Sequence, residues 1–242
     1  MFELFDPQTD YVISEGANLP HWYQPGVTYF VTFRTEDSIP TDVRRRWHAE
    51  RTDWLQRHGI SDYQLEFRNL PIPLRKDFHE RFSREYMELL DKGFGACVLA
   101  RPELSSIVAD SLFSFDSSKY HLGDFVVMPN HVHVMVCLLG ETEIEAQCTS
   151  WKRFTARRIN QALKKTGRFW QEESFDHLIR SAEQFAAIQD YIASNPLNLN
   201  FDEYFLFQFE RSNEVDGTRS VPATVPGTSP VPPARHRREP QS

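Results

Sequence analysis

Residues 128–136 read MPNHVHVMV, a Pro-Asn turn followed by histidines that alternate with apolar residues. Side chains alternate between the two faces of an extended strand, so His131 and His133 share one face and the three valines share the other. The valines predict that their face is buried in a core. Two imidazoles on one face form half of a metal site. A catalytic metal also needs a further ligand and an open coordination position.

The sequence on both sides of this stretch predicts more strands and helices. Runs of β-branched and aromatic residues predict strands at 28–33, 120–127 and 131–138, with an edge strand within 169–180. Apolar residues at helical spacing predict helices at 41–58, 77–90, 102–113, 143–165 and 181–194. The second and third strands are expected to be antiparallel neighbours, because the connection between them is short.

The expected fold class is α+β, with a small, mainly antiparallel sheet and helices packed on one side of it. Residues 1–210 are expected to form one domain, in which 36–95 is a helical elaboration and 1–25 and 59–76 are irregular. Residues 211–242 are rich in Ser, Thr, Pro, Gly and Val and end in ARHRREPQS. Because this segment lacks periodic apolar residues, it is predicted to be a disordered tail.

The composition is that of a soluble globular protein: 40% of the 242 residues are hydrophobic and 25% are charged. No apolar run approaches the ~20 residues of a membrane span. The acidic start, MFELFDPQTD, has no apolar segment typical of a signal peptide. Cys97, Cys137 and Cys148 form no CxxC pair and are expected to be reduced and buried. These features predict a cytoplasmic protein without a membrane partner or a cysteine-based zinc site.

The net charge of −7 argues against a nucleic-acid partner, but the charges are unevenly distributed. Residues 150–180 contain eight Lys or Arg and three acids, a local net charge of +5. The local field matters more than the net charge for attracting a polyanion. A nucleic-acid partner therefore stays possible on electrostatic grounds.

The predicted helix 181–194 offers two further polar groups. Tyr191 and Asn195 are four residues apart and so lie on the same face of a helix. Phe185, Ile188 and Ile192 form an adjacent apolar face that would press the helix against the sheet. On local grounds alone, a tyrosine at this place is most often a core residue, and an asparagine before proline most often ends a helix.

Four blocks together resemble one protein family. They are VVMPNHVHVMV at 126–136, SWKRFTARRIN at 150–160, FWQEESFDHLIR at 169–180 and YIASNP at 191–196. Their order and spacing resemble the REP-associated tyrosine transposases, which belong to the single-tyrosine HUH (His-hydrophobic-His) transposases and carry an IS200-like domain. The resemblance extends from about Tyr29 to Asn200. It implies a ferredoxin-like sheet of the HUH type.

The resemblance also implies roles for particular residues. His131 and His133 match the histidines that bind a divalent metal, usually Mg or Mn, and Asn195 matches the position expected to supply a third ligand. Tyr191 matches the nucleophile. Four basic residues fall in the block that faces DNA in such proteins: Lys152, Arg153, Arg157 and Arg158.

The chemistry implied is cleavage and rejoining of single-stranded DNA, for example at the foot of a hairpin. A metal stabilises the charge of the phosphodiester while the tyrosine attacks, leaving a 5′-phosphotyrosine and a free 3′-hydroxyl. The covalent link conserves the energy of the broken bond, which agrees with the absence of a GxxxxGK[ST] nucleotide-binding motif. Trp151 and Trp170 are candidates for stacking on bases, although a core position suits them better.

Two other functions fit parts of the sequence. A nucleotide hydrolase of the histidine-triad kind alternates three histidines, but Met135 stands where the third would be. A domesticated module that binds DNA hairpins without cutting them is the second alternative. The intact set of His131, His133 and Tyr191 favours an enzyme. The oligomeric state, monomer or homodimer, stays open.

Overall fold

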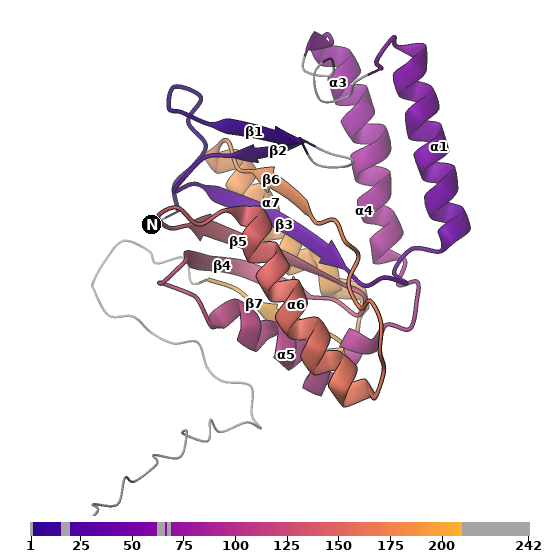
Figure 1. Cartoon of the computed structure of the whole chain (residues 1–242), viewed down its shortest axis with the longest axis vertical. Coiled ribbons are helices and arrows are strands. Elements are labelled where there is room, and N and C mark those ends of the chain that lie inside the picture. Colours follow the sequence, from indigo (N-terminus) through magenta and orange to yellow (C-terminus); the bar gives the residue numbers. More distant parts are fainter. Residues whose placement is uncertain (1, 16–19, 62–65, 67–68, 210–242) are drawn as a thin grey trace, which may run out of the picture. The chain divides into compact units, whose positions relative to one another are not determined.

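The computed structural model describes residues 2–15, 20–61, 66 and 69–209, and its centre is a five-stranded antiparallel sheet (Figure 1). The strand order is β6-β3-β5-β4-β7. The strands are β3 (Thr28–Arg34), β4 (Tyr120–Val127), β5 (His131–Leu138), β6 (Phe175–Leu178) and β7 (Phe205–Phe207). The predicted α+β class and the predicted strands are confirmed, including the antiparallel pairing of β4 with β5 and the edge position of β6.

The central strand, β5, carries the two histidines, and all of its residues are buried. On one side β3 pairs with it so that Thr32 lies opposite His133, and on the other side β4 places Val126 opposite the same residue. The valines of β5 belong to one apolar core and Met135 to a second core. The predicted alternation of faces along this strand is therefore confirmed.

Helices cover both faces of the sheet (Figure 1). The valine face packs against α5 (Pro102–Phe113) and α6 (Ile144–Leu163), and the histidine face packs against α7 (Ala182–Ser194). The expectation of helices on one side only is wrong. Since every residue of β3 and β5 is buried, both faces of these strands require cover.

The larger core is closed by α6, which Trp151 anchors. Its indole Nε1 donates a hydrogen bond of 3.0 Å to the Tyr120 hydroxyl, which in turn donates one of 2.6 Å to the Leu112 carbonyl. Trp170 is also buried, and its Nε1 donates to Thr155 Oγ1 at 2.8 Å. Both tryptophans are therefore core residues with satisfied donors, and neither offers a face for stacking on a base.

A helical arm, residues 41–91, extends from one end of the sheet (Figure 1). It consists of α1 (Thr41–Arg57), α3 (Ile72–Phe78), a π-helical turn (His79–Ser83) and α4 (Arg84–Asp91). One apolar cluster, formed by Trp54, Leu55, Ile60, Phe78 and Phe82, joins α1, α3 and the π-helical turn, and a second cluster with Leu89 and Leu90 packs α4 against α1.

The helix α3 begins earlier than the sequence predicted. It starts at Ile72 rather than at residue 77, so the loop expected at 59–76 is wrong for its last five residues. Pro71 and Pro73 suggested a loop. A proline is accommodated in the first turn of a helix, however, because the first N–H groups have no intrahelical partner. The Pro71 carbonyl accepts hydrogen bonds from the N–H groups of Leu74 and Arg75.

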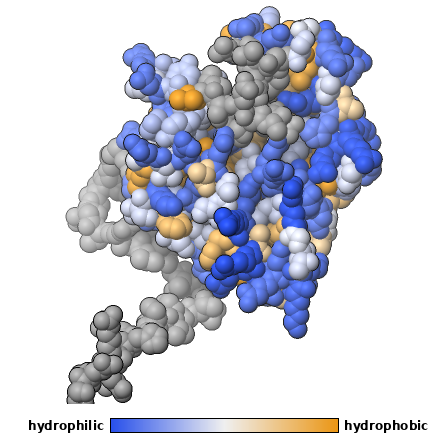
Figure 2. Space-filling view, in the orientation of Figure 1, coloured by the Kyte–Doolittle hydropathy of each residue, from blue (hydrophilic) through white to orange (hydrophobic). Residues whose placement is uncertain are grey.

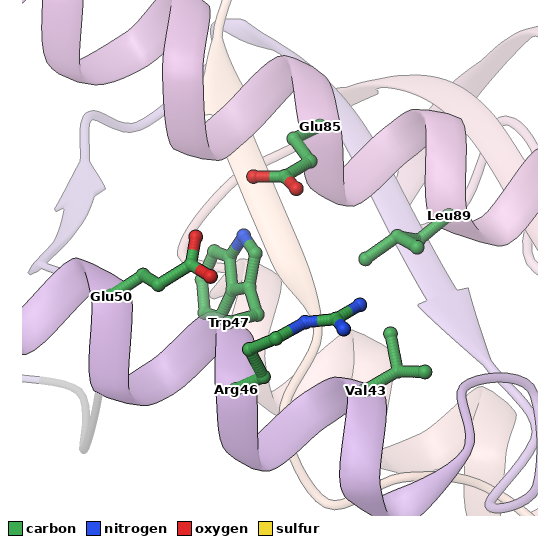
Figure 3. Close-up of a pocket in the computed structure, with 6 residues that line it drawn as sticks. All are labelled: Val43, Arg46, Trp47, Glu50, Glu85 and Leu89. Carbon is green, nitrogen blue, oxygen red and sulfur yellow. The ribbon is translucent and has the colours of Figure 1, made fainter.

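A small hollow lies on the surface of the arm, between α1 and α4 (Figure 3). Arg46, Trp47 and Glu50 reach it from α1, and Glu85 and Leu89 from α4. Neither histidine of β5 lines it. The hollow is therefore separate from the histidine pair.

The remaining short elements surround this core. Residues 1–25 were expected to be irregular, but β1 (Val12–Glu15) and β2 (Pro20–Tyr23) form an antiparallel hairpin there. Two 3₁₀ turns, Val98–Ala100 and Asn195–Asn198, precede α5 and follow α7. The predicted tail at 211–242 lies outside the described residues.

The predictions about the cysteines and about membrane spans can be compared with the described part of the chain. All three cysteines are free thiols; Cys137 and Cys148 are buried, whereas Cys97 is half-buried. Among the described residues, no helix has both the length and the apolar composition that crossing a membrane requires.

Replacing Tyr120 by Phe tests the anchor of α6. The variant leaves the Trp151 indole N–H and the Leu112 carbonyl without their buried partner, which costs about 1–3 kcal/mol. We expect urea unfolding to show a loss of this size in the free energy of unfolding. Tyr11→Phe is the matched control, because Tyr11 is 42% exposed; its change should stay within about 0.5 kcal/mol. Equal losses in the two variants would contradict the assignment.

Candidate active site

The two imidazoles of β5 lie side by side on the face that α7 covers. Their ring centroids are 4.6 Å apart, and both side chains are almost completely buried. Phe30 of β3 stacks on the His133 ring with a centroid distance of 5.4 Å. The pair is thus held rigidly at the centre of the sheet rather than on a mobile loop.

Asn130 fixes the orientation and the tautomer of His131. Its amide nitrogen donates to the Phe94 carbonyl at 3.0 Å and to the Leu90 carbonyl at 3.4 Å, so its Oδ1 faces the ring. That oxygen lies 2.7 Å from His131 Nδ1 and accepts a hydrogen bond from it. The proton therefore resides on Nδ1, and the lone pair of Nε2 is free to bind a metal.

His133 is held in the same way by the neighbouring strand. Its Nδ1 lies 2.7 Å from the hydroxyl oxygen of Thr32 on β3. Its Nε2 lies 3.2 Å from the Tyr191 hydroxyl of α7. Both rings thus use Nδ1 for a bond to a supporting side chain and turn Nε2 toward the same space.

Burial keeps both rings neutral. It lowers the pKa of His131 to about 3, and burial together with the neighbouring His131 lowers the pKa of His133 well below its usual range. A neutral imidazole is the form that binds a metal ion. The pair is therefore ready to act as ligands at neutral pH without first losing protons.

Local sequence and packing place Tyr191 at this site. The Ser181 side chain caps α7 by accepting a hydrogen bond from the Gln184 N–H. Ile188 and Ile192 then press the helix against the sheet in the smaller core. The Tyr191 ring meets the His133 ring edge-on at 5.1 Å between centroids. The tyrosine and the two histidines thus lie at one place in the structure.

Asn195, one turn beyond Tyr191, lies beside an acid that the sequence analysis missed. Its Nδ2 donates a hydrogen bond of 3.4 Å to Asp91 Oδ1, while its own Oδ1 is buried without a partner. Asp91 is the last residue of α4, and its Oδ1 lies 3.7 Å from His131 Nε2. Nothing in the local sequence around Asp91 marks it, because only the fold of the arm brings it to the site.

These side chains form a set of metal-binding atoms. In the part of the chain that the structure describes, the one group of His, Cys, Asp and Glu suited to a metal ion is Asp91, His131 and His133. Their ligand atoms lie within 4.8 Å of one another. The Nε2 of His131 has no hydrogen-bond partner although it is buried. A buried polar atom left unpaired is costly, and a bound cation would remove that cost here.

The predicted DNA-binding residues lie elsewhere, on α6, which covers the opposite face of the sheet. The Lys152 ammonium donates to the backbone carbonyls of Gln171 and Glu172, and burial lowers its pKa. Arg153, Arg157 and Arg158 are exposed. Hydrophilic residues dominate the face of the molecule that carries α6 (Figure 2). The structure thus brings the histidines, Tyr191 and Asn195 together, but not the basic residues.

A family model described as "Transposase IS200 like" matches residues 103–195. This region begins in α5 and ends at Asn195, so it includes both histidines and Tyr191. The match covers less than half of the chain. Over residues 103–195, the predicted resemblance to IS200-like transposases is confirmed. The arm and Asp91 lie outside the matched region.

Individual proteins are also similar to this chain. A protein of Haemophilus influenzae without an assigned function is 26% identical over 35% of this chain and 59% of its own length. The chain thus spans less than two thirds of that relative. A solved REP-associated tyrosine transposase bound to a REP hairpin is 14% identical, covers 76% of this chain and 74% of its own, and gives a TM-score of 0.41. A putative transposase from Deinococcus radiodurans R1 is 16% identical, with 75% and 97% covered and a TM-score of 0.31.

The protonation of His131 is directly measurable. Long-range ¹H–¹⁵N spectra of the metal-free protein should show a neutral ring with its proton on Nδ1 from pH 7 down to pH 5, because its pKa of about 3 lies below that range. His131→Gln identifies the signals. Asn130→Ala removes the acceptor at Nδ1, so a mixture of tautomers is expected in that variant. A ring that gains a proton near its unperturbed pKa of about 6.5 would contradict this account.

Proposed function

We propose that residues 1–210 form a metal-dependent transposase domain that cleaves and rejoins single-stranded DNA through a covalent 5′-phosphotyrosine on Tyr191. The observation that carries the proposal is the 3.2 Å separation of the Tyr191 hydroxyl and His133 Nε2. A nucleophilic residue type and a metal-ligand atom thus meet at one point, beside the unpaired His131 Nε2.

The residues present fit a divalent metal such as Mg or Mn. His131, His133 and Asn195 would hold it through two neutral imidazole nitrogens and an amide oxygen, and the buried Asn195 Oδ1 has no other partner. When bound, such an ion polarises a phosphodiester and stabilises the charge that develops on it. Both imidazoles are buried, and burial strengthens the electrostatic interactions that they make.

The proposed reaction of Tyr191 is an exchange of phosphate esters. The phenol oxygen attacks phosphorus and loses its proton; the bond from phosphorus to the 3′-oxygen breaks, and that oxygen leaves with a proton as a 3′-hydroxyl. The phosphate stays on the tyrosine and on the 5′ end of the downstream strand. Attack by a 3′-hydroxyl reverses the sequence and rejoins DNA without an external energy source.

The protonation of Tyr191 explains why a cation is needed. Burial raises the pKa of the Tyr191 hydroxyl, and the negative charge of Asp91 raises it further. The phenol on its own is thus a weak nucleophile at neutral pH. A positive charge at the adjacent imidazoles would favour the phenolate form and bring the pKa back down.

Hairpin or repeat DNA is the proposed substrate of this chain. The similar solved protein bound to a REP hairpin supports that choice, and so do the exposed arginines of α6, which suit a phosphate backbone. Arg153 and Arg157 are four residues apart and share one side of the helix. We call Arg153, Arg157 and Arg158 the arginine row. Because α6 and Tyr191 lie on opposite faces of the sheet, we propose that the arginine row binds the duplex part of the substrate.

The two alternatives differ from this proposal in observable ways. A hairpin-binding module without activity would bind the same DNA and form no covalent adduct. The histidine-triad hydrolase has little support, because Met135 is completely buried in the smaller core. The match to transposases opposes it as well.

A covalent-adduct assay tests the nucleophile. Incubation with Mn²⁺ and a single-stranded hairpin oligonucleotide should give a protein–DNA species that survives denaturing electrophoresis. A label on the 3′ end of the oligonucleotide should stay with the protein, whereas a label on the 5′ end should be released, because the downstream strand is the one attached. A chelator should abolish the adduct.

Tyr191→Phe should reduce the adduct below detection while hairpin affinity stays within about threefold, since only the attacking hydroxyl is removed. Tyr11→Phe, an exposed tyrosine on another part of the surface, is the matched control and should react as the unmodified protein does. An adduct that persists in Tyr191→Phe would mean that another residue is the nucleophile. Binding without any adduct in the unmodified protein would favour the non-catalytic module.

Salt dependence tests the arginine row. Each lost phosphate contact is expected to reduce the slope of log K against log salt by about 0.7 to 0.9. In the triple variant with Gln at Arg153, Arg157 and Arg158, the magnitude of this slope should therefore be smaller by about 2 to 3. Fluorescence anisotropy with a labelled hairpin between 50 and 200 mM KCl measures it. The control is Arg57→Gln, whose guanidinium pairs with Asp53 at 2.7 Å on the arm; an equal effect there would overturn the proposal.

A further inference from the structure

We infer that Asp91 is a ligand of the metal, so that the helical arm supplies part of the active site. The inference rests on the proposed function, since it concerns the same metal. It goes beyond the match to known transposases, because Asp91 lies outside residues 103–195. The chain would then hold its metal with a carboxylate in addition to the two imidazoles and the amide.

The first support is distance. Asp91 Oδ1 lies 3.7 Å from His131 Nε2 and 3.4 Å from Asn195 Nδ2, and the ligand atoms of Asp91 and both histidines lie within 4.8 Å of one another. His131 Nε2 carries a lone pair rather than a proton, because its proton resides on Nδ1. The approach of Asp91 is therefore not a hydrogen bond to the ring. Two electron-pair donors face each other there, which is the arrangement that a cation between them would stabilise.

The second support is that Asp91 stands where a helix disfavours an acid. The carboxyl end of a helix carries a partial negative charge, which an aspartate in the last turn increases. No basic residue lies in the last turn of α4 to offset it. A local cost of this kind is typical of functional sites, where a bound group offsets it.

The third support is that the end of α4 is fixed against the site. The Asn130 amide, which orients His131, also donates to the carbonyls of Leu90 and Phe94 on either side of Asp91. One turn earlier, the Tyr86 hydroxyl accepts a hydrogen bond from Arg34 Nε of β3, and the guanidinium carbon lies 5.2 Å from the Tyr86 ring centroid. Asp91 is thus presented by a fixed turn, although its side chain is 41% exposed.

Metal affinity without DNA tests the inference. In a calorimetric titration of the full-length protein with Mn²⁺, Asp91→Asn should bind about 10-fold or more weakly, because replacing even an indirect partner of a metal ligand costs about 10- to 100-fold. Glu85→Gln is the matched control: it makes the same change of charge on the same helix, but faces the hollow toward α1 (Figure 3). The His133→Ala variant lacks one of the proposed ligands, so the heat of Mn²⁺ binding that it loses is the heat that comes from this site.

The outcomes separate the two proposals. Weaker binding in Asp91→Asn alone supports the inference, whereas equal binding in Asp91→Asn and the unmodified protein overturns it and leaves the proposed function standing. Equal weakening in Asp91→Asn and Glu85→Gln also overturns it, because net charge would then explain the effect. Mn²⁺ binding that His133→Ala does not change overturns the metal site itself, and with it the proposed function.

A second measurement does not depend on whether the variant folds. Crystals of the unmodified protein grown with Mn²⁺ locate the ion by its anomalous scattering. An Asp91 oxygen bonded to the ion supports the inference. An ion at the two imidazoles with Asp91 turned to solvent overturns it.

Discussion

The pairing of β5 with its two neighbours is the interaction on which the rest of this structure depends. Because the strand period is two, the register that buries the valines against α5 and α6 also turns both imidazoles toward α7. A shift of the register by one residue would turn the valines toward α7 and place both polar imidazole rings in the larger core. Apolar packing on one face thus determines the position of the chemical groups on the other, so the stability of the sheet and the geometry of the site have a common origin.

The supporting groups matter as much as the imidazoles themselves. Thr32 and Asn130 each bond to the Nδ1 of one ring, so that both Nε2 atoms face the site, and Asn130 in the turn before β5 fixes the tautomer of His131. Asn130 also contacts the end of α4 through its amide nitrogen. One buried amide therefore connects the sheet, the histidine and the arm. Such pre-organised support is what a rigid metal site requires.

Much of the site could be predicted from the sequence because its signals are local. The alternation HVHV predicts two rings on one face, and the spacing from Tyr191 to Asn195 predicts a shared helical face. Other features have no local signal. Asp91 reaches the histidines only through the packing of the arm, and the basic residues of α6 lie on the far face because the valine side of the sheet needs cover. The run TYFVTF in β3 does indicate a strand that is buried on both faces, because it lacks the alternation of polar and apolar residues that a half-exposed strand has.

The π-helical turn at His79–Ser83 has a consequence for the length of the arm. Leu74, Phe78, Phe82, Tyr86 and Leu90 recur at every fourth residue, and each step of four overshoots an α-helical turn by about 40°. A wider turn between α3 and α4 offsets part of this drift and keeps the apolar residues facing α1. The π-helical turn thus sets the orientation of α4 about its own axis. With Leu90 buried, Asp91 points toward the histidines. Adding or removing a single residue within 84–91 would rotate that carboxylate by about 100°. Surface insertions usually tolerate changes in length. The number of residues in this arm is nevertheless constrained, because it determines the direction in which Asp91 points.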